Sequence, residues 1–142
     1  MSWDLFAQDF PKVASVDQIP DDFRPSPVGA RDALIAKVKA VFLDSDFSDP
    51  SWGLLERDGW SIEINLGEDA ICEDFALHVR GGGPGAIHGV GVILDATGSR
   101  AIDAQTGEFF DVEAAEASFE RWQEYRDKVV EPDRLRNRRE TF

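Results

Sequence analysis

The chain has 142 residues, of which 42% are hydrophobic and 11% aromatic, and its formal net charge is −13. A chain of this size and apolar content can bury one core without covalent staples, which excludes an intrinsically disordered body. Its single cysteine, Cys72, excludes an intramolecular disulfide and a thiolate metal cluster, and it favours a reducing compartment.

The negative charge is concentrated in the body of the chain. Residues 131–142 hold four arginines against three carboxylates, a local charge of +1, so the remainder carries −14. Such a surface repels nucleic acid and anionic lipid and attracts a basic partner, although solubility alone also accounts for it. With neither a signal-like start nor an apolar run of about 20 residues, the sequence predicts a cytoplasmic protein without membrane contacts.

The first expected elements are a strand and a helix. Apolar and polar side chains alternate over residues 3–10, which is typical of a strand. Prolines then mark a loop, and Ser26-Pro27 resembles a helix N-cap followed by proline. Apolar residues at helical spacing predict a helix from about Pro27 to Leu43.

A hairpin follows a connector rich in turn residues at 44–50. Asp58-Gly59 is a preferred two-residue hairpin turn, and it separates the alternating segments 52–57 and 60–66. A two-residue loop fixes the register, so that facing residue numbers have a constant sum. The expected facing pairs are Arg57 with Trp60, Leu55 with Ile62, Leu54 with Glu63, and Trp52 with Asn65.

The remaining elements alternate between strands and helices. Residues 74–80 repeat the strand pattern, and the glycine run 81–85 leads into a second helix that Gly98 ends as its C-cap. A short strand is expected at residues 100–103. Asp111 then caps a third helix, which Pro132 ends.

This element order, β-α-β-β-β-α-β-α, predicts an α+β fold. The economical architecture is a two-layer sandwich, in which three helices cover one face of a mixed, mainly antiparallel five-stranded sheet. Residues 1–130 would form a single domain and residues 131–142 a charged tail. The second sheet face would remain available.

Several segments carry a resemblance that spans nearly the whole chain. They are Ser-Trp-Asp at 2–4, Ile-Pro-Asp-Asp-Phe at 19–23, Phe-Ser-Asp-Pro-Ser-Trp-Gly at 47–53 and His-Val-Arg-Gly at 78–81. The chain thereby resembles a group of small, uncharacterised acidic bacterial proteins that begin Met-Ser-Trp-Asp. The resemblance implies a freestanding bacterial domain and carries over no activity, cofactor or site residue.

Strand alternation gathers a set of polar and aromatic side chains on the available face. If Ile62 and Ile64 face the helices, the opposite face carries the candidate binding residues Trp52, Glu63, Asn65, His78 and Arg80. Tryptophan and arginine dominate binding hot spots, so this set suits partner or ligand recognition. An ordinary solvated sheet face, with His78 paired to Glu63 for charge balance, is the competing interpretation.

Two functions remain open on these residues. The leading hypothesis is a non-catalytic binding module for a protein partner, as an inhibitor or immunity-type protein would be toward a basic protein. The alternative is a small enzyme or small-molecule binder that uses Glu63 as base, His78 as acid or orienting partner, and Arg80 as an oxyanion or phosphate clamp. A homodimer seam on this face is a third option.

Other motifs predict little chemistry. The glycine run 81–85 lacks the Lys-Ser/Thr ending and the dinucleotide fingerprint of a phosphate loop, so it predicts only a turn and no cofactor. A metal site from Glu63, His78 and Asp103 is not expected, because histidines and cysteines are too few. The acidic neighbours of Cys72 should raise the pKa of its thiol.

Overall fold

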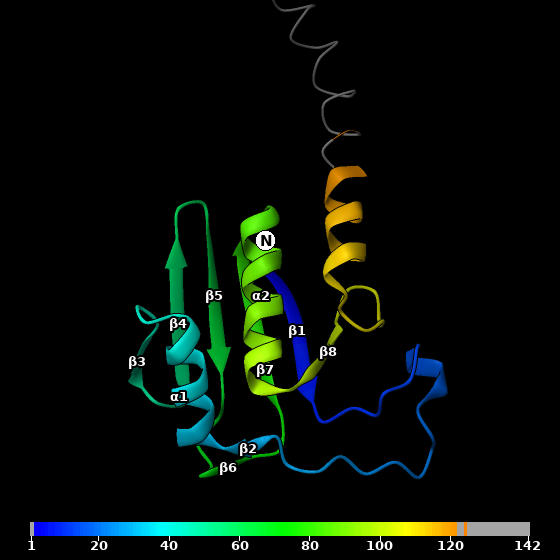
Figure 1. Ribbon diagram of the computed structural model, residues 1–142, viewed down its shortest axis with the longest axis horizontal. Helices are drawn as coiled ribbons and strands as arrows, with labels where there is room; N and C mark the ends of the chain where they lie inside the picture. Colours follow the sequence, from blue (N-terminus) through cyan, green and yellow to red (C-terminus); the bar gives the residue numbers. More distant parts are fainter. Residues whose placement is uncertain (1, 122–123, 125–142) are drawn as a thin grey trace, which may run out of the picture.

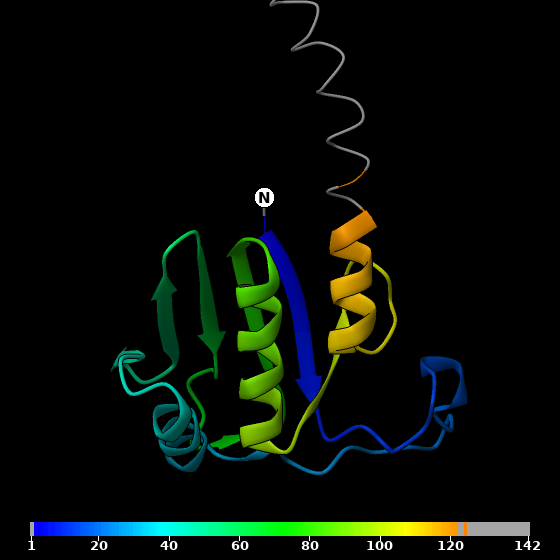
Figure 2. The same ribbon diagram turned by 45° about the horizontal axis from the view of Figure 1, so that its top comes forward.

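Two layers make up the fold, a sheet and a set of helices that lie on one side of it (Figure 1). The computed structural model describes residues 2–121 and 124. In the view turned by 45°, α2 (Pro84–Thr97) and the helix over residues 112–121 lie in front of the sheet, and α1 (Arg31–Val41) lies near its lower end (Figure 2). The predicted α+β sandwich with helices on one face is therefore confirmed.

The main sheet is antiparallel throughout and has the strand order β3-β4-β5-β7-β1-β8. Its strands are β1 (Ser2–Gln8), β3 (Asp46–Asp49), β4 (Trp52–Arg57), β5 (Trp60–Asn65), β7 (Phe75–Gly81) and β8 (Arg100–Asp103). A second sheet pairs β2 (Gly29–Ala30) with β6 (Ile71–Cys72). The N-terminal strand thus lies between two strands that come much later in the chain.

The helical layer consists of α1 (Arg31–Val41), α2 (Pro84–Thr97) and a helix over residues 112–121. A short 3-10 helix, η1 (Val16–Gln18), lies in the loop after β1. Gly98 ends α2 in the left-handed conformation, with φ 65°, as the sequence predicts. Asp111 accepts a hydrogen bond from the backbone N–H of Glu113 at 2.9 Å, which confirms its capping role.

The core lies between the helices and the inner sheet face. Ile62 and Ile64 from β5 and Leu77 and Val79 from β7 are fully buried there, whereas the residues between them are not. The predicted alternation of buried and open side chains is confirmed on both strands. Further fully buried members are Leu5, Leu34, Leu55, Val90 and Ile93.

Glycines in α2 have a packing reason that the sequence does not reveal. A Cβ atom at Gly85 would lie 2.7 Å from Nε1 of Trp60, and one at Gly89 would lie 3.0 Å from the far edge of the same indole. The two glycines are one helical turn apart and together make room for the ring. Close packing of Trp60 therefore offsets the low helix propensity of glycine.

The structure differs from the expected elements chiefly in the main sheet and at the start of the first helix. Over the described residues the sheet has six strands rather than five, because residues 46–49 form the edge strand β3 instead of a connector. All of its described pairs are antiparallel, whereas the sequence predicts a mixed sheet. The first helix begins at Arg31 rather than Pro27, since Val28 and Arg31 donate backbone hydrogen bonds to Cys72 and Ala70. Pairing with β6 keeps residues 28–30 extended.

Part of the third helix and the expected tail lie outside the described residues. The helical stripe predicted at Trp122 and Val129, the stop at Pro132 and the segment 131–142 all belong to this part of the chain. Among the residues that are described, each helix is too short or too polar to cross a bilayer.

Candidate functional site

The outer face of the sheet is open to solvent. Phe6 on β1 is 50% exposed and Trp52 on β4 is 40% exposed, although both are large and apolar. The candidate residues Trp52, Glu63, Asn65, His78 and Arg80 all lie on this face, opposite the buried residues of the same strands. The predicted parity and the predicted hairpin register are both confirmed.

Three side chains form a row across four neighbouring strands of this face. The indole of Trp52 stacks on the imidazole of His78, with ring centroids 5.6 Å apart and planes inclined by 14°. Nδ1 of His78 hydrogen-bonds Oδ1 of Asp4 at 2.8 Å. The row Trp52–His78–Asp4 thus connects β4, β7 and β1 and passes over β5.

The Asp4 carboxylate fixes the orientation of the imidazole. Hydrogen bonds from His78 and from the Ser2 hydroxyl hold the pKa of Asp4 below its ordinary value. An ionised carboxylate has no proton to give, so Nδ1 of His78 must be the donor. Nε2 is then the nitrogen left for another group.

Glu63 and Asn65 contribute differently from what the sequence suggests. Glu63 directly faces His78 in the strand register, but the hydrogen-bond partner of His78 is Asp4 on the opposite side. The expected pairing of His78 with Glu63 is therefore wrong. Asn65 accepts the backbone N–H of Gly67 at 3.2 Å, so its amide stabilises the turn after β5.

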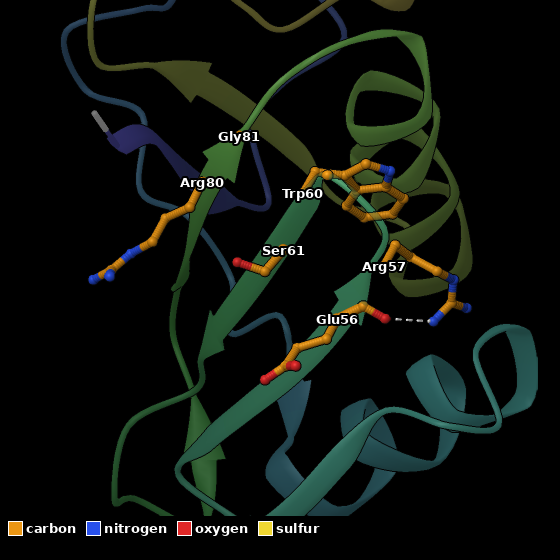
Figure 3. A pocket seen from close by; sticks show the side chains of 7 residues that line it. Glu56, Arg57, Trp60, Ser61, Arg80 and Gly81 are labelled. Carbon is orange, nitrogen blue, oxygen red and sulfur yellow. Dashed lines mark hydrogen bonds between the residues drawn. The ribbon is translucent and has the colours of Figure 1, made fainter.

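Arg80 is the next outward-facing residue after His78 on β7, beyond the Trp52–His78–Asp4 row. It faces Ser61 in the register, and Ser61 faces Glu56. These three side chains project from the outer face and line a shallow hollow of about 310 Å³, whereas Trp60 and Arg57 lie on the helix side (Figure 3). Of the five predicted residues, only Arg80 lines this hollow.

An acidic edge borders the Trp52 end of the face. Asp46 and Asp49 on β3 accept hydrogen bonds from the backbone N–H and hydroxyl groups of Ser48 and Ser51 respectively. These bonds hold the pKa of both carboxyl groups below the ordinary value. The edge therefore keeps its negative charge to a lower pH than ordinary aspartates would.

The remaining candidates for chemistry are not part of this face. Asp103 lies on the helix side, where its Oδ2 accepts the indole N–H of Trp3 at 2.9 Å, so it is separated from His78 by the sheet. In the described part of the chain, no group of three metal-ligating side chains is close enough to hold an ion. The pKa of Cys72 is raised as predicted, mainly by burial and only secondarily by Asp69 and Asp74.

Sequence reasoning missed Asp4 as a member of the site. Alternation in the first strand indicates that Asp4 and Phe6 share a face, but no local signal shows that this strand pairs with residues 75–80. The Asp4–His78 contact joins residues 74 positions apart. Comparisons with protein-family models, with curated proteins and with solved structures give no match to this chain, so its function rests on the geometry alone.

Proposed function

We propose that the protein is a binding module that docks a basic protein partner on the open face of its sheet. The Trp52–His78–Asp4 row carries this proposal, because it presents a large aromatic side chain on a face that no described helix covers. Stacking and hydrogen bonding hold the indole and imidazole before a partner arrives. Fewer rotamers are then lost on binding, which favours affinity.

Charge supports a basic partner. The face carries the carboxylates of Asp4, Glu56 and Glu63, and the acidic strand β3 borders it. Of the two arginines on the described strands of this face, Arg100 has its guanidinium bound by the carbonyl oxygens of Pro11 and Val13 in the loop after β1. The Arg80 guanidinium has no such partner among the described residues, so it can contact a docked protein. Complementary charge would speed association and make it salt-dependent.

Apolar contacts would supply the remaining affinity. Phe6 faces Ala76 on one side and Ile102 on the other, so the part of the face around Phe6 is apolar. An inhibitor or immunity-type role in a bacterial cytoplasm suits these features, and the buried free thiol of Cys72 supports a reducing location.

Affinity capture from a bacterial lysate tests the proposal when face variants are compared. Wild type, Trp52→Ala and the helix-side control Asp32→Asn would be immobilised at matched density. We expect a basic protein that wild type and Asp32→Asn retain, that Trp52→Ala loses, and that moderate salt releases. Equal capture by all three proteins, or capture indifferent to salt, would contradict the proposal.

A second candidate function is a small enzyme or small-molecule binder based on Glu63, His78 and Arg80. The hydrogen bond from His78 to Asp4 favours it, since a carboxylate that orients an imidazole is the arrangement of a general base. Against it, no hydrogen bond or ion pair within residues 2–121 joins Arg80 to His78 or Glu63.

A thermal-shift screen with nucleotides and metabolites separates the two functions. A ligand at about 100 times its dissociation constant adds about 2.7 kcal/mol of stability. A ligand-induced rise in Tm that His78→Gln abolishes and Asp32→Asn retains would support the second function. Self-association through the same face is checked by sedimentation. If wild type is a dimer and Trp52→Ala is a monomer, the face is a homodimer interface, and this result would contradict both functions.

A further inference from the structure

A large cavity lies on the helix side of the sheet, between the start of α2 and the helix over residues 112–121. Its volume is about 720 Å³, within the range of small-molecule sites. Residues from β1, β8, the glycine run after β7 and both helices line it. The cavity is therefore separate from the open sheet face, and a ligand bound in it would be additional to the proposed protein partner.

Half of the apolar residues in the lining are aromatic. Trp3, Phe110 and Phe119 line the cavity, and the rings of Trp3 and Phe110 contact one another with centroids 5.7 Å apart. Phe109 also lines it, but the guanidinium of Arg100 lies over that ring, 3.7 Å from its centroid. Three aromatic side chains other than Phe109 thus belong to the wall.

The charged part of the lining has one sign. Its ionisable residues are Asp103, Glu108 and Asp111, and none of the lining residues within 2–121 is a lysine, arginine or histidine. The start of α2 at Gly83 adds about half a positive charge to one end of the cavity, which is less than the nominal charge of three carboxylates. The electrostatic field of the cavity thus favours a positively charged occupant.

We propose that this cavity binds a small organic cation, an ammonium or amidinium group attached to an apolar body. Aromatic faces attract such cations through their quadrupoles, and the carboxylates of the lining add a direct attraction. An apolar body would fill the space along Ala86, Ile87 and Ala115. Neutral and anionic molecules of the same size lack the electrostatic contribution.

The glycine run gives the cavity its shape at one end. Gly83 has φ 106°, and a Cβ atom at Gly82 or Gly83 would lie 3.9 Å from the Phe119 ring. Side chains at these positions would project toward Phe119 and reduce the space. The absence of side chains at Gly82 and Gly83 thus keeps this end of the cavity open.

Benzyltrimethylammonium is a suitable probe, with benzyl alcohol and benzoate as neutral and anionic controls. Binding is followed by the Trp3 indole N–H signal in ¹⁵N-edited NMR spectra, assigned with Trp3→Phe, and by calorimetry at low salt. We expect the cation to shift the Trp3 signal, benzyl alcohol to bind about tenfold more weakly, and benzoate to bind more weakly still. Benzoate binding as tightly as the cation would overturn the proposal.

Variants distinguish the cavity from general surface charge. Glu108→Gln and Asp103→Asn should each weaken binding of the cation several-fold, whereas Glu68→Gln and Asp32→Asn, which make the same changes outside the cavity, should leave it unchanged. Phe119→Leu keeps an apolar side chain, and it should weaken binding of the cation more than binding of benzyl alcohol. An unshifted Trp3 signal, or equal effects of cavity and control variants, would contradict the proposal.

Discussion

Trp52 and His78 stack on one another across a strand that separates them in the sheet. Their rings lie nearly parallel, 5.6 Å apart, although Trp52 directly faces Asn65 and His78 directly faces Glu63. The contact is therefore diagonal, and it depends on the long reach of the indole. Removing either ring should change the environment of the other.

Asp4 should determine which nitrogen of His78 carries the proton. Because the Asp4 carboxylate accepts from Nδ1, the neutral imidazole should be protonated at Nδ1 in the wild type. Long-range ¹H–¹⁵N NMR spectra report the tautomer directly. Asp4→Ala should return His78 to the Nε2-protonated form that free histidine prefers. A wild-type spectrum that already shows Nε2–H would contradict the assigned hydrogen bond.

Asp4 should also contribute to acid sensitivity. Its folded-state pKa is lowered, by the hydrogen bond from His78 first and from Ser2 second. A lowered pKa stabilises the fold above the ordinary aspartate pKa, and this contribution is lost as the pH falls through the lowered value. Urea melts below pH 5 should therefore show a shallower acid decline for Asp4→Asn than for wild type. Parallel declines would show that the interaction contributes nothing to folding.

A substitution in the core should lower the free energy of unfolding more than a substitution on the outer face. Ile64 is fully buried, so Ile64→Ala should cost roughly 2 to 5 kcal/mol through the cavity it leaves. Arg80 is exposed and has no ion pair within residues 2–121, so Arg80→Ala should cost less than about 1 kcal/mol. Urea melts measure both changes. Equal costs would mean that the outer face is covered.

Gly81 should tolerate alanine less well than Gly98 does. Both residues have positive φ angles, 78° and 65°, so both substitutions strain the backbone by about 1 to 2 kcal/mol. At Gly81 the new Cβ atom would also lie 2.2 Å from the carbonyl oxygen of Gly59, whereas Gly98 has open space. The unfolding free energy should fall further for Gly81→Ala. Similar losses would show that the hairpin moves aside at little cost.

Cys72 should react slowly with thiol reagents in the native protein. The residue is 3% exposed, and burial raises the pKa of its thiol, so the thiolate is both scarce and shielded. Modification by a chromogenic disulfide should accelerate strongly in urea. Fast native labelling would indicate that β2 and β6 open readily, since β6 carries Cys72.

The sequence predicts the parts of this face that depend on local signals. The Asp58-Gly59 turn determines the β4–β5 register, and alternation determines which side chains share a face. The position of β1 between β7 and β8 has no such signal, so the sequence does not reveal the role of Asp4. Strand β3 is also hidden, because Asp46, Ser48 and Asp49 are typical of turns, yet an edge strand tolerates them with one side unpaired.

The helix-side cavity escapes sequence-based prediction for a related reason. Trp3 and Phe119 belong to opposite ends of the described chain, and only the sheet order brings their elements together. The glycine run is correctly predicted as a turn before α2, but its contribution to the cavity wall depends on the position of the third helix. The residues that line this cavity are therefore determined by long-range strand pairing and helix packing, which local sequence patterns do not reveal.

A matched pair of charge variants tests the central claim most directly. Glu63→Gln removes a carboxylate from the open face, and Glu120→Gln makes the same change on an exposed position of the helix over residues 112–121. The dissociation constant of the captured partner would be measured by calorimetry for wild type and both variants at low salt. We predict that Glu63→Gln weakens binding several-fold and that Glu120→Gln leaves it unchanged. Equal effects of the two variants, or a loss confined to Glu120→Gln, would contradict docking on the sheet face.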